Sequence, residues 1–114
     1  MSALNDVRAE IAGKLSAAGC EATTDPKCQV PAVLVGAPSV LMAQGVGGWQ
    51  VEYPINIMGV PPGNEGALEW MLGELETALT VFPGAAFPRT IEHNGADVPA
   101  YVLTVNQSVS NPNC

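Results

Sequence analysis

Residues 49–58 read WQVEYPINIM, and they alternate apolar and polar side chains more regularly than any other stretch of the chain. The odd-numbered positions from Trp49 to Ile57 are all apolar or aromatic, whereas the even-numbered positions are mostly polar. A period of two residues is typical of a β-strand that buries one face. Pro54 has no backbone N–H group to donate, so it predicts an edge position, a bulge or a bend within this strand.

The segment before this strand predicts a helix, a loop and a second strand. Apolar residues recur at helical spacing within residues 3–18, namely Leu4, Val7, Ile11 and Leu15. Residues 20–29 are polar and include an Asp-Pro pair, which favours a loop. The valine-rich run Val30–Val35 predicts a largely buried strand, which residues 39–48 extend briefly before a glycine-rich turn.

The segment after the strand predicts a second helix over residues 65–82, with Asn64 as its N-cap. Five apolar residues form a stripe that we expect to face the core: Leu68, Met71, Leu72, Leu75 and Leu79. The segment PGAAFP, residues 83–88, ends this helix because proline and glycine do not continue it.

Residues 89–109 predict a β-hairpin that closes the fold. Arg89–Glu92 and Val98–Val109 are the two expected strands, and the Asn-Gly pair at residues 94–95 is a strong signal for the turn between them. A polar tail follows at residues 110–114.

The predicted order of elements is α-β-β-α-β-β. We therefore expect an α+β fold in which two helices pack on one face of a mostly antiparallel or mixed sheet. A chain of 114 residues is long enough for one domain with its own core and too short for two. Residues 1–114 are thus predicted to form a single domain.

The composition indicates assembly with other subunits. Charged residues make up 13% of the chain and apolar residues 47%. The charged fraction is half of the roughly 25% that is usual in globular proteins. Soluble monomers normally display more charge, so we expect partner subunits to cover part of the surface.

The formal net charge is −7, and the four basic residues, Arg8, Lys14, Lys27 and Arg89, are scattered singly. Sequence-specific nucleic-acid binding requires clustered basic residues, so it is not expected, although DNA could pass through an acidic ring. No segment has the roughly 18 apolar residues of a transmembrane helix, and no secretory signal is visible. We expect synthesis in the cytosol and no membrane partner.

The residues capable of catalysis or metal binding do not combine into a recognisable site. His93 is the only histidine, and we expect it to be a solvated residue beside the hairpin turn. Cys20, Cys28 and Cys114 include no C-x-x-C pair, so zinc binding is not indicated. Cys20 and Cys28 could pair in principle, but we expect thiols in a reducing compartment. We predict no catalytic residue, no cofactor and no metal site, and the chain is not expected to be an enzyme.

The loop at residues 59–66, GVPPGNEG, joins a strand to a helix, as phosphate-binding loops do. A P-loop requires Lys followed by Ser or Thr, and neither is present at the required place. Pro61 and Pro62 lack the N–H groups that would hold phosphate oxygens, and Glu65 would repel an anion. A rigid connection is the preferred interpretation of this loop.

The side of the second helix away from the leucine stripe predicts a subunit interface. At 100° per residue, Trp70 is expected nearly opposite the stripe, beside Thr77 and Val81. A tryptophan in that position exposes a large apolar area, which either a loop of the same chain or another subunit must cover.

An acidic arc lies on the same helix. Glu65, Glu69 and Glu76 share it, and the simplest interpretation is a solvated face. The alternative is a weak divalent-cation site between subunits. We include Glu65 and Glu69 among the interface candidates together with Trp70 and its neighbours.

The chain resembles the small tail terminator proteins of long-tailed, siphovirus-type bacteriophages, especially those of actinobacterial hosts. The resemblance lies in a first amphipathic helix followed by the segments VPAVLVGAP, WQVEYPINIMGV, GALEWMLGELETAL and VPAYVLTVNQSV. It implies a non-catalytic α/β subunit that forms a hexameric ring at the head-proximal end of the virion tail. Such a ring caps the tail tube, stops polymerisation of the major tail tube protein and docks the head-tail connector or stopper protein.

This chain is short for that family, so its expected contact loops, residues 36–48 and 83–88, are modest. Two alternatives stay open. One is another neck component, such as a head-tail connector or stopper. The other is a small anion-binding α/β domain that uses the loop at residues 59–66.

Overall fold

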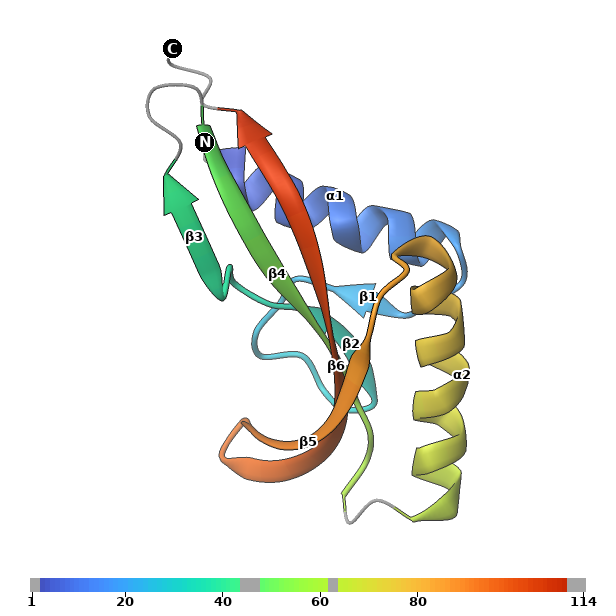
Figure 1. Cartoon of the computed structure of the whole chain (residues 1–114). Coiled ribbons are helices and arrows are strands. Elements are labelled where there is room, and N and C mark those ends of the chain that lie inside the picture. The colour runs from blue at the N-terminus through green and yellow to red at the C-terminus, as the bar shows by residue number, and fades with distance from the viewer. Residues whose placement is uncertain (1–2, 44–47, 62–63, 111–114) are drawn as a thin grey trace.

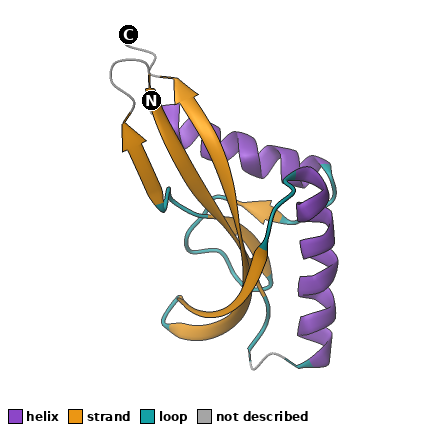
Figure 2. Cartoon of the chain, viewed as in Figure 1, coloured by secondary structure: helices purple, strands orange, loops and turns teal. Residues whose placement is uncertain are grey.

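The structure is a computed structural model that describes residues 3–43, 48–61 and 64–110. These residues form two helices and a six-stranded mixed sheet, and both helices pack against the same face of the sheet (Figures 1 and 2). In chain order the elements are α1 (Ala3–Ala17), β1 (Ala22–Thr23), β2 (Ala32–Val35), β3 (Val40–Ala43), β4 (Gly48–Met58), α2 (Glu65–Val81), β5 (Ala86–His93) and β6 (Ala96–Ser110). The predicted α+β class and helix placement are confirmed.

The structure differs from the prediction by two short strands. β1 lies within the segment predicted to be a loop, and it pairs in parallel with β2. β3 is a separate strand rather than a brief extension of β2. The predicted glycine-rich turn includes residues 44–47, and most of the predicted tail is residues 111–114; both lie outside the described residues.

β4 lies in the middle of the sheet. It pairs with β6 along its whole length, from Gly48↔Ser110 to Met58↔Ala100. Its other edge is shared by β2 and β3, which both run antiparallel to it. The strand order is β1-β2-β4-β6-β5, with β3 beside β4 on the β2 side.

Pro54 lies where β2 and β3 meet. Residues 36–39 separate the two strands and face only Tyr53 and Pro54 of β4, because Val35 pairs with Ile55 and Val40 pairs with Glu52. The Gly36 amide donates to the Pro54 carbonyl at 2.9 Å, which places the proline nitrogen on this interrupted edge. The predicted irregularity is therefore a bulge in the neighbouring strand.

The main core lies between the odd-numbered side of β4 and the two helices. Val51, Tyr53, Ile55 and Ile57 are at most 2% exposed. They pack with buried residues of both helices and of the neighbouring strands: Ile11, Ala12, Leu15, Val33, Val35, Met71, Leu75, Ala78, Leu103, Val105 and Val109. This arrangement buries the apolar side that the period of two residues identified.

A second, smaller core lies on the opposite face of the sheet. It contains Ala32, Leu34, Met58, Val98 and Ala100, with the half-buried Cys28, Val30 and Ile91 packed against it. The β5–β6 hairpin curves strongly at this end of the molecule (Figure 1). The curvature brings the hairpin turn against the segment that precedes β2.

Candidate functional site

Helix α2 has a different rotation from the one its leucines predict. Its buried residues are Ala67, Met71, Leu75 and Ala78, whereas Leu68 and Leu72 are 40% and 39% exposed. The physical reason is that Ala67 and Ala78 face the sheet, and their short side chains allow α2 to approach it closely. At Gly59, a Cβ atom would lie only 2.9 Å from the Met71 sulfur, so a glycine makes room for that side chain. The leucine stripe therefore faces partly outward.

The same rotation corrects the predicted position of Trp70. Its indole is half-buried and packs against the main core, so it is not opposite the buried face of the helix. It lines a small pocket of about 330 Å³ together with Pro31, Val60, Asn64, Gly66 and Ala67. Val81 is also half-buried against the core. The Thr77 hydroxyl donates to the Gly73 carbonyl at 3.3 Å.

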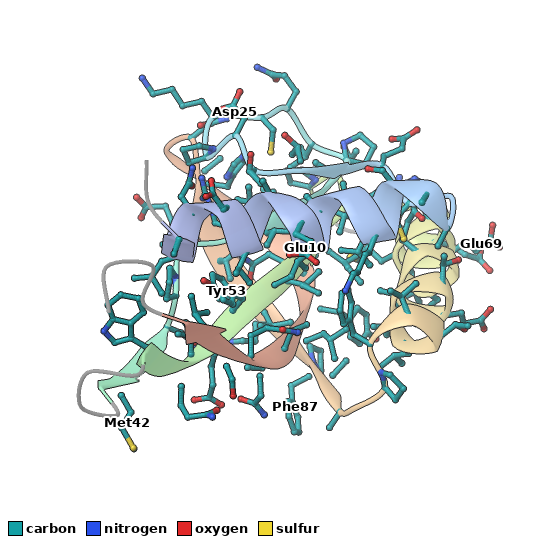
Figure 3. All side chains as sticks on the ribbon, turned by 90° about the horizontal axis from the view of Figure 1, so that it is seen from above. Glu10, Asp25, Met42, Tyr53, Glu69 and Phe87 are labelled. Atoms are coloured by element: carbon teal, nitrogen blue, oxygen red, sulfur yellow. The ribbon has the colours of Figure 1, made fainter. Side chains whose placement is uncertain are left out.

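The remaining interface candidates, Glu65 and Glu69, are exposed. At 100° per residue they follow the exposed Leu68 and Leu72 around the helix, on the side away from Trp70. Figure 3 shows Glu69 pointing outward from α2. The five candidates thus form two groups on different sides of α2, and the exposed apolar residues accompany the acidic group.

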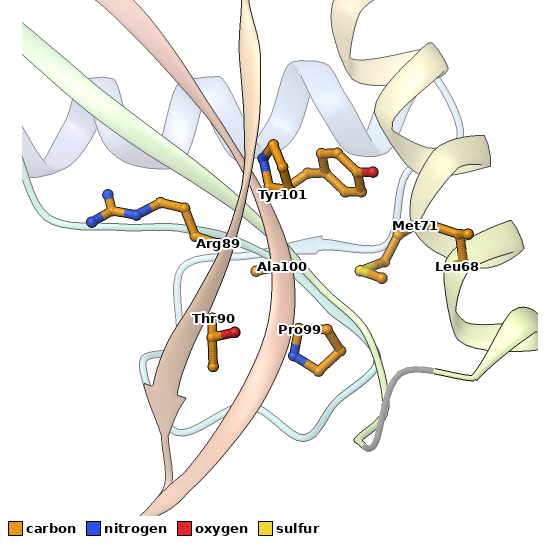
Figure 4. Close-up of a pocket in the computed structure, with 8 residues that line it drawn as sticks. Leu68, Met71, Arg89, Thr90, Pro99, Ala100 and Tyr101 are labelled. Carbon is orange, nitrogen blue, oxygen red and sulfur yellow. The ribbon is translucent and has the colours of Figure 1, made fainter.

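A groove of about 450 Å³ lies between α2 and the β5–β6 hairpin. We call it the α2–β5 groove. Leu68 and Met71 line it from α2, and the hairpin contributes Pro88, Arg89, Thr90, Pro99, Ala100 and Tyr101 (Figure 4). The side chains on its walls are mainly apolar, and its volume is within the range of roughly 300–1,000 Å³ that is usual for binding pockets.

The side chains of Phe87 and Arg89 point to the other face of the hairpin, although Arg89 also borders the groove. Phe87 pairs with Val102, and Arg89 pairs with Ala100 of the second core, so both point away from the face that packs on the helices. Phe87 is 64% exposed. Figure 4 shows the Arg89 side chain directed away from α2.

This pair was not predicted from the sequence, because Phe87 belongs to the segment PGAAFP, which was expected to end the helix. The alternation of Phe87, Arg89 and Ile91 in a strand that starts at Ala86 was the available signal.

The sheet face away from the helices is largely polar where the loops leave it open. Gln50 donates to the Ser108 hydroxyl at 2.6 Å across β4 and β6. Met42, on β3, is 62% exposed. Figure 3 shows Met42 and Phe87 on the side of the strands away from α1, although they belong to different strands at different edges.

The loop before α2 behaves as a helix start. The Asn64 side chain accepts a 3.0 Å hydrogen bond from the Ala67 amide, which confirms the predicted N-cap. One of the free N–H groups at the helix start is therefore already bonded. Pro62, one of the two prolines in the argument against phosphate binding, lies outside the described residues.

His93 is buried, at 8% exposure, so its predicted solvation is wrong. Its Nε2 atom lies 2.6 Å from the Cys28 carbonyl oxygen, and the Asn94 amide donates to the same oxygen at 3.1 Å. These contacts attach the hairpin turn to the segment before β2, which sequence spacing could not reveal.

The neighbouring thiol is not activated by this histidine. The Cys28 sulfur lies 3.9 Å from His93 Nε2. Burial, followed by the charge of Asp25, raises the pKa of Cys28, whereas a nucleophilic thiol needs a lowered pKa. His93 Nε2 is occupied by a carbonyl oxygen, so it must carry a proton and cannot act as a base towards the thiol.

Cys20 and Cys28 are free thiols, as expected, and Cys114 lies outside the described residues. Among residues 3–43, 48–61 and 64–110, no group of three or more His, Cys, Asp or Glu side chains could hold a metal ion. No helix in those ranges is long and apolar enough to cross a membrane.

Comparison with known proteins adds no further assignment: no protein-family model matches the chain, and neither does any curated protein or solved structure. The candidate functional site therefore rests on the geometry alone. It consists of the α2–β5 groove, the acidic residues beside it on α2, and the exposed Phe87 on the other face of the same hairpin.

Proposed function

We propose that the chain is a structural subunit of a bacteriophage tail, and specifically a tail terminator that assembles into a ring at the head-proximal end of the tail. The observation that carries this proposal is the pairing of an apolar groove with an exposed aromatic residue on the edge hairpin. Leu68 on one wall, Leu72 beside it on α2, and Phe87 on the other face of the hairpin leave substantial apolar area in water. Such surfaces mark sites of protein–protein contact.

The order of elements supports the more specific part of the proposal. The first amphipathic helix, the strand WQVEYPINIMGV, the helix GALEWMLGELETAL and the closing hairpin are the segments in which the chain resembles tail terminators. In this role the ring, expected to be a hexamer, contacts the major tail tube protein on one side and the head-tail connector or stopper on the other. The protein is made in the host cytoplasm and resides in the virion.

The acidic balance fits a ring through which DNA passes. With a net charge of −7, the subunit repels the phosphate backbone rather than binding it. An acidic channel would let the DNA pass without binding to the ring.

The test uses the purified chain and the tail tube protein encoded by the same genome. Negative-stain electron microscopy should reveal rings of the chain, alone or on tube ends. Addition of the chain to polymerising tube protein should stop tube growth and leave one ring on a tube end. Tubes that grow equally long with and without the chain would exclude the terminator role, and rings that bind only the head connector would favour another neck component.

A further inference from the structure

We propose that Phe87 and Arg89 of one copy dock into the α2–β5 groove of a second copy of this chain, in a head-to-tail contact. The proposal rests on the ring assembly proposed above and identifies the surfaces that build the ring. Of the interface candidates derived from the sequence, Glu65 and Glu69 are kept, whereas Trp70, Thr77 and Val81 are not part of the proposed contact.

The first step is the exposure of Phe87. It is 64% exposed, the highest value among the large apolar residues of the described chain. It lies on β5, which is the last strand of the sheet and has no neighbour on its outer side among the described strands. Pro88, which follows it, is expected in an edge strand because it lacks a backbone donor. The outer edge of the hairpin is therefore suited to bind another protein through side chains rather than through backbone hydrogen bonds.

The second step is the chemistry of the groove. Leu68, Met71, Pro88, Pro99 and Tyr101 provide most of the lining, whereas Arg89 and Thr90 add polar atoms along β5. The volume of about 450 Å³ has room for an aromatic ring. Tyr101 is half-buried, so part of its ring remains available to an incoming aromatic side chain.

The third step is charge. Arg89 forms no ion pair or hydrogen bond with any described residue, whereas Lys14 already lies 3.8 Å from Glu10. Glu65 and Glu69 are exposed on α2 beside the leucines that border the groove. Two copies with a net charge of −7 repel each other unless their contact brings a cation to an acidic region.

Arg89 supplies that cation. It lies two residues after Phe87 in the strand and therefore on the same face. When the Phe87 ring enters the groove of a neighbour, Arg89 accompanies it towards the acidic side of the neighbour's α2. The second copy is favoured as occupant because both its apolar and its charged groups match this surface.

The fourth step is symmetry. The groove lies on the helix side of the hairpin, and Phe87 lies on the other side. A copy that donates Phe87 to one neighbour therefore still has an open groove for another. Head-to-tail contacts of this kind continue from subunit to subunit until a ring closes.

The experiment compares two variants with matched controls. Phe87→Ser removes the projecting ring, and Leu72→Glu places a charge beside the groove. Met42→Ser removes a side chain of nearly equal exposure from a different edge, and Thr80→Glu adds a charge elsewhere on the exposed surface of α2. Circular dichroism melting checks that all four variants fold, and light scattering coupled to size-exclusion chromatography gives the mass of each.

We expect the wild type and both controls to form oligomers, and Phe87→Ser and Leu72→Glu each to remain monomeric. Mixing these two variants should produce a one-to-one dimer. The Leu72→Glu variant still has Phe87, which can enter the unaltered groove of the Phe87→Ser variant. A dimer that does not extend further is the specific signature of a head-to-tail contact.

Oligomers of Phe87→Ser equal to those of the wild type would overturn the inference while leaving ring assembly and tube capping intact. A wild-type chain that stays monomeric at every concentration would also overturn it, and tube-growth measurements would then decide the terminator role separately. Conversely, loss of assembly in Phe87→Ser by a protein that never caps tubes would support the interface and reject the terminator role.

Discussion

The hydroxyl group of Tyr53 donates a 2.7 Å hydrogen bond to the backbone carbonyl of Leu4, which joins the middle of β4 to the first turn of α1. Tyr53 is fully buried, so its hydroxyl has no access to water as an alternative partner. The bond explains how β4 can contain a polar group on its buried side.

Replacement of Tyr53 by phenylalanine should lower the free energy of unfolding by about 1 kcal/mol, the usual contribution of one such hydrogen bond. Urea-induced unfolding followed by circular dichroism measures the change. Tyr101→Phe is the matched control, because the Tyr101 hydroxyl has no hydrogen-bond partner among the described residues. Equal losses in the two variants would contradict a specific role for the Tyr53–Leu4 bond.

A methyl group at Gly59 should destabilise the fold by about 1 kcal/mol, because it would crowd the Met71 side chain. The flexible thioether can move, which limits the cost. Gly73→Ala is the control, since no atom lies within 4 Å of the new Cβ and the residue is in a helix. That variant should gain roughly 0.5–1 kcal/mol. Thermal melts of both proteins test the prediction, and stabilisation by Gly59→Ala would refute the close packing of α2.

The buried thiol of Cys20 makes stability sensitive to alkaline pH. Burial, assisted by the charge and hydrogen bonding of Glu74, raises the pKa of Cys20 from 9.0 to about 11. The unfolded chain therefore loses this proton at lower pH than the folded chain. Stability should be unaffected by this group below pH 9 and should decline as the pH rises from 9 towards 11.

Urea titrations of the wild type and Cys20→Ala on both sides of pH 9 test this prediction. The variant should show a smaller decline, because alanine does not ionise. Other groups that titrate at high pH, including Tyr53, are common to both proteins and cancel in the comparison. An identical decline of the free energy of unfolding in the two proteins would show that Cys20 does not cause the loss of stability at high pH.

Charge reversal should reveal which acidic residue meets Arg89. Arg89→Glu should weaken self-association several-fold, since it places a carboxylate against the acidic side of α2. Mixing Arg89→Glu with Glu69→Arg should restore association between unlike chains, measured by native mass spectrometry. The same mixture with Glu10→Arg, on the exposed surface of α1, is the control and should show no recovery. Recovery with that control would indicate a general charge effect.

The sequence predicted the sheet better than the helix orientation. The alternation from Trp49 to Ile57 identified the buried face of β4, because a strand has only two sides to choose between. On α2, Leu68, Leu72 and the buried alanines all suit an apolar surface, and periodicity alone could not tell which arc faces the sheet. Close approach favoured the small residues, so the predicted stripe was displaced and Trp70 turned inward.

The contacts of His93 and the short strand β1 had no local signal. His93 bonds to Cys28, which is 65 positions away, and β1 has only two residues within a polar segment. Such features depend on the curvature of the hairpin and on the position of β2. They appear only when the chain is assembled in three dimensions.

The bulge opposite Pro54 divides one edge of β4 into two segments, paired with β2 and β3, that differ in local stability. β2 is fully buried and is held on both sides, by β1 and β4, whereas β3 pairs only with β4 among the described strands. Residues 36–39 interrupt the pairing with β4 between these two strands, so separation of β3 from β4 need not extend to β2. The amide hydrogens of Val40 and Met42, which face β4, should exchange with solvent sooner than that of Leu34, which also faces β4. The subunit therefore has one margin that can detach while its centre stays closed.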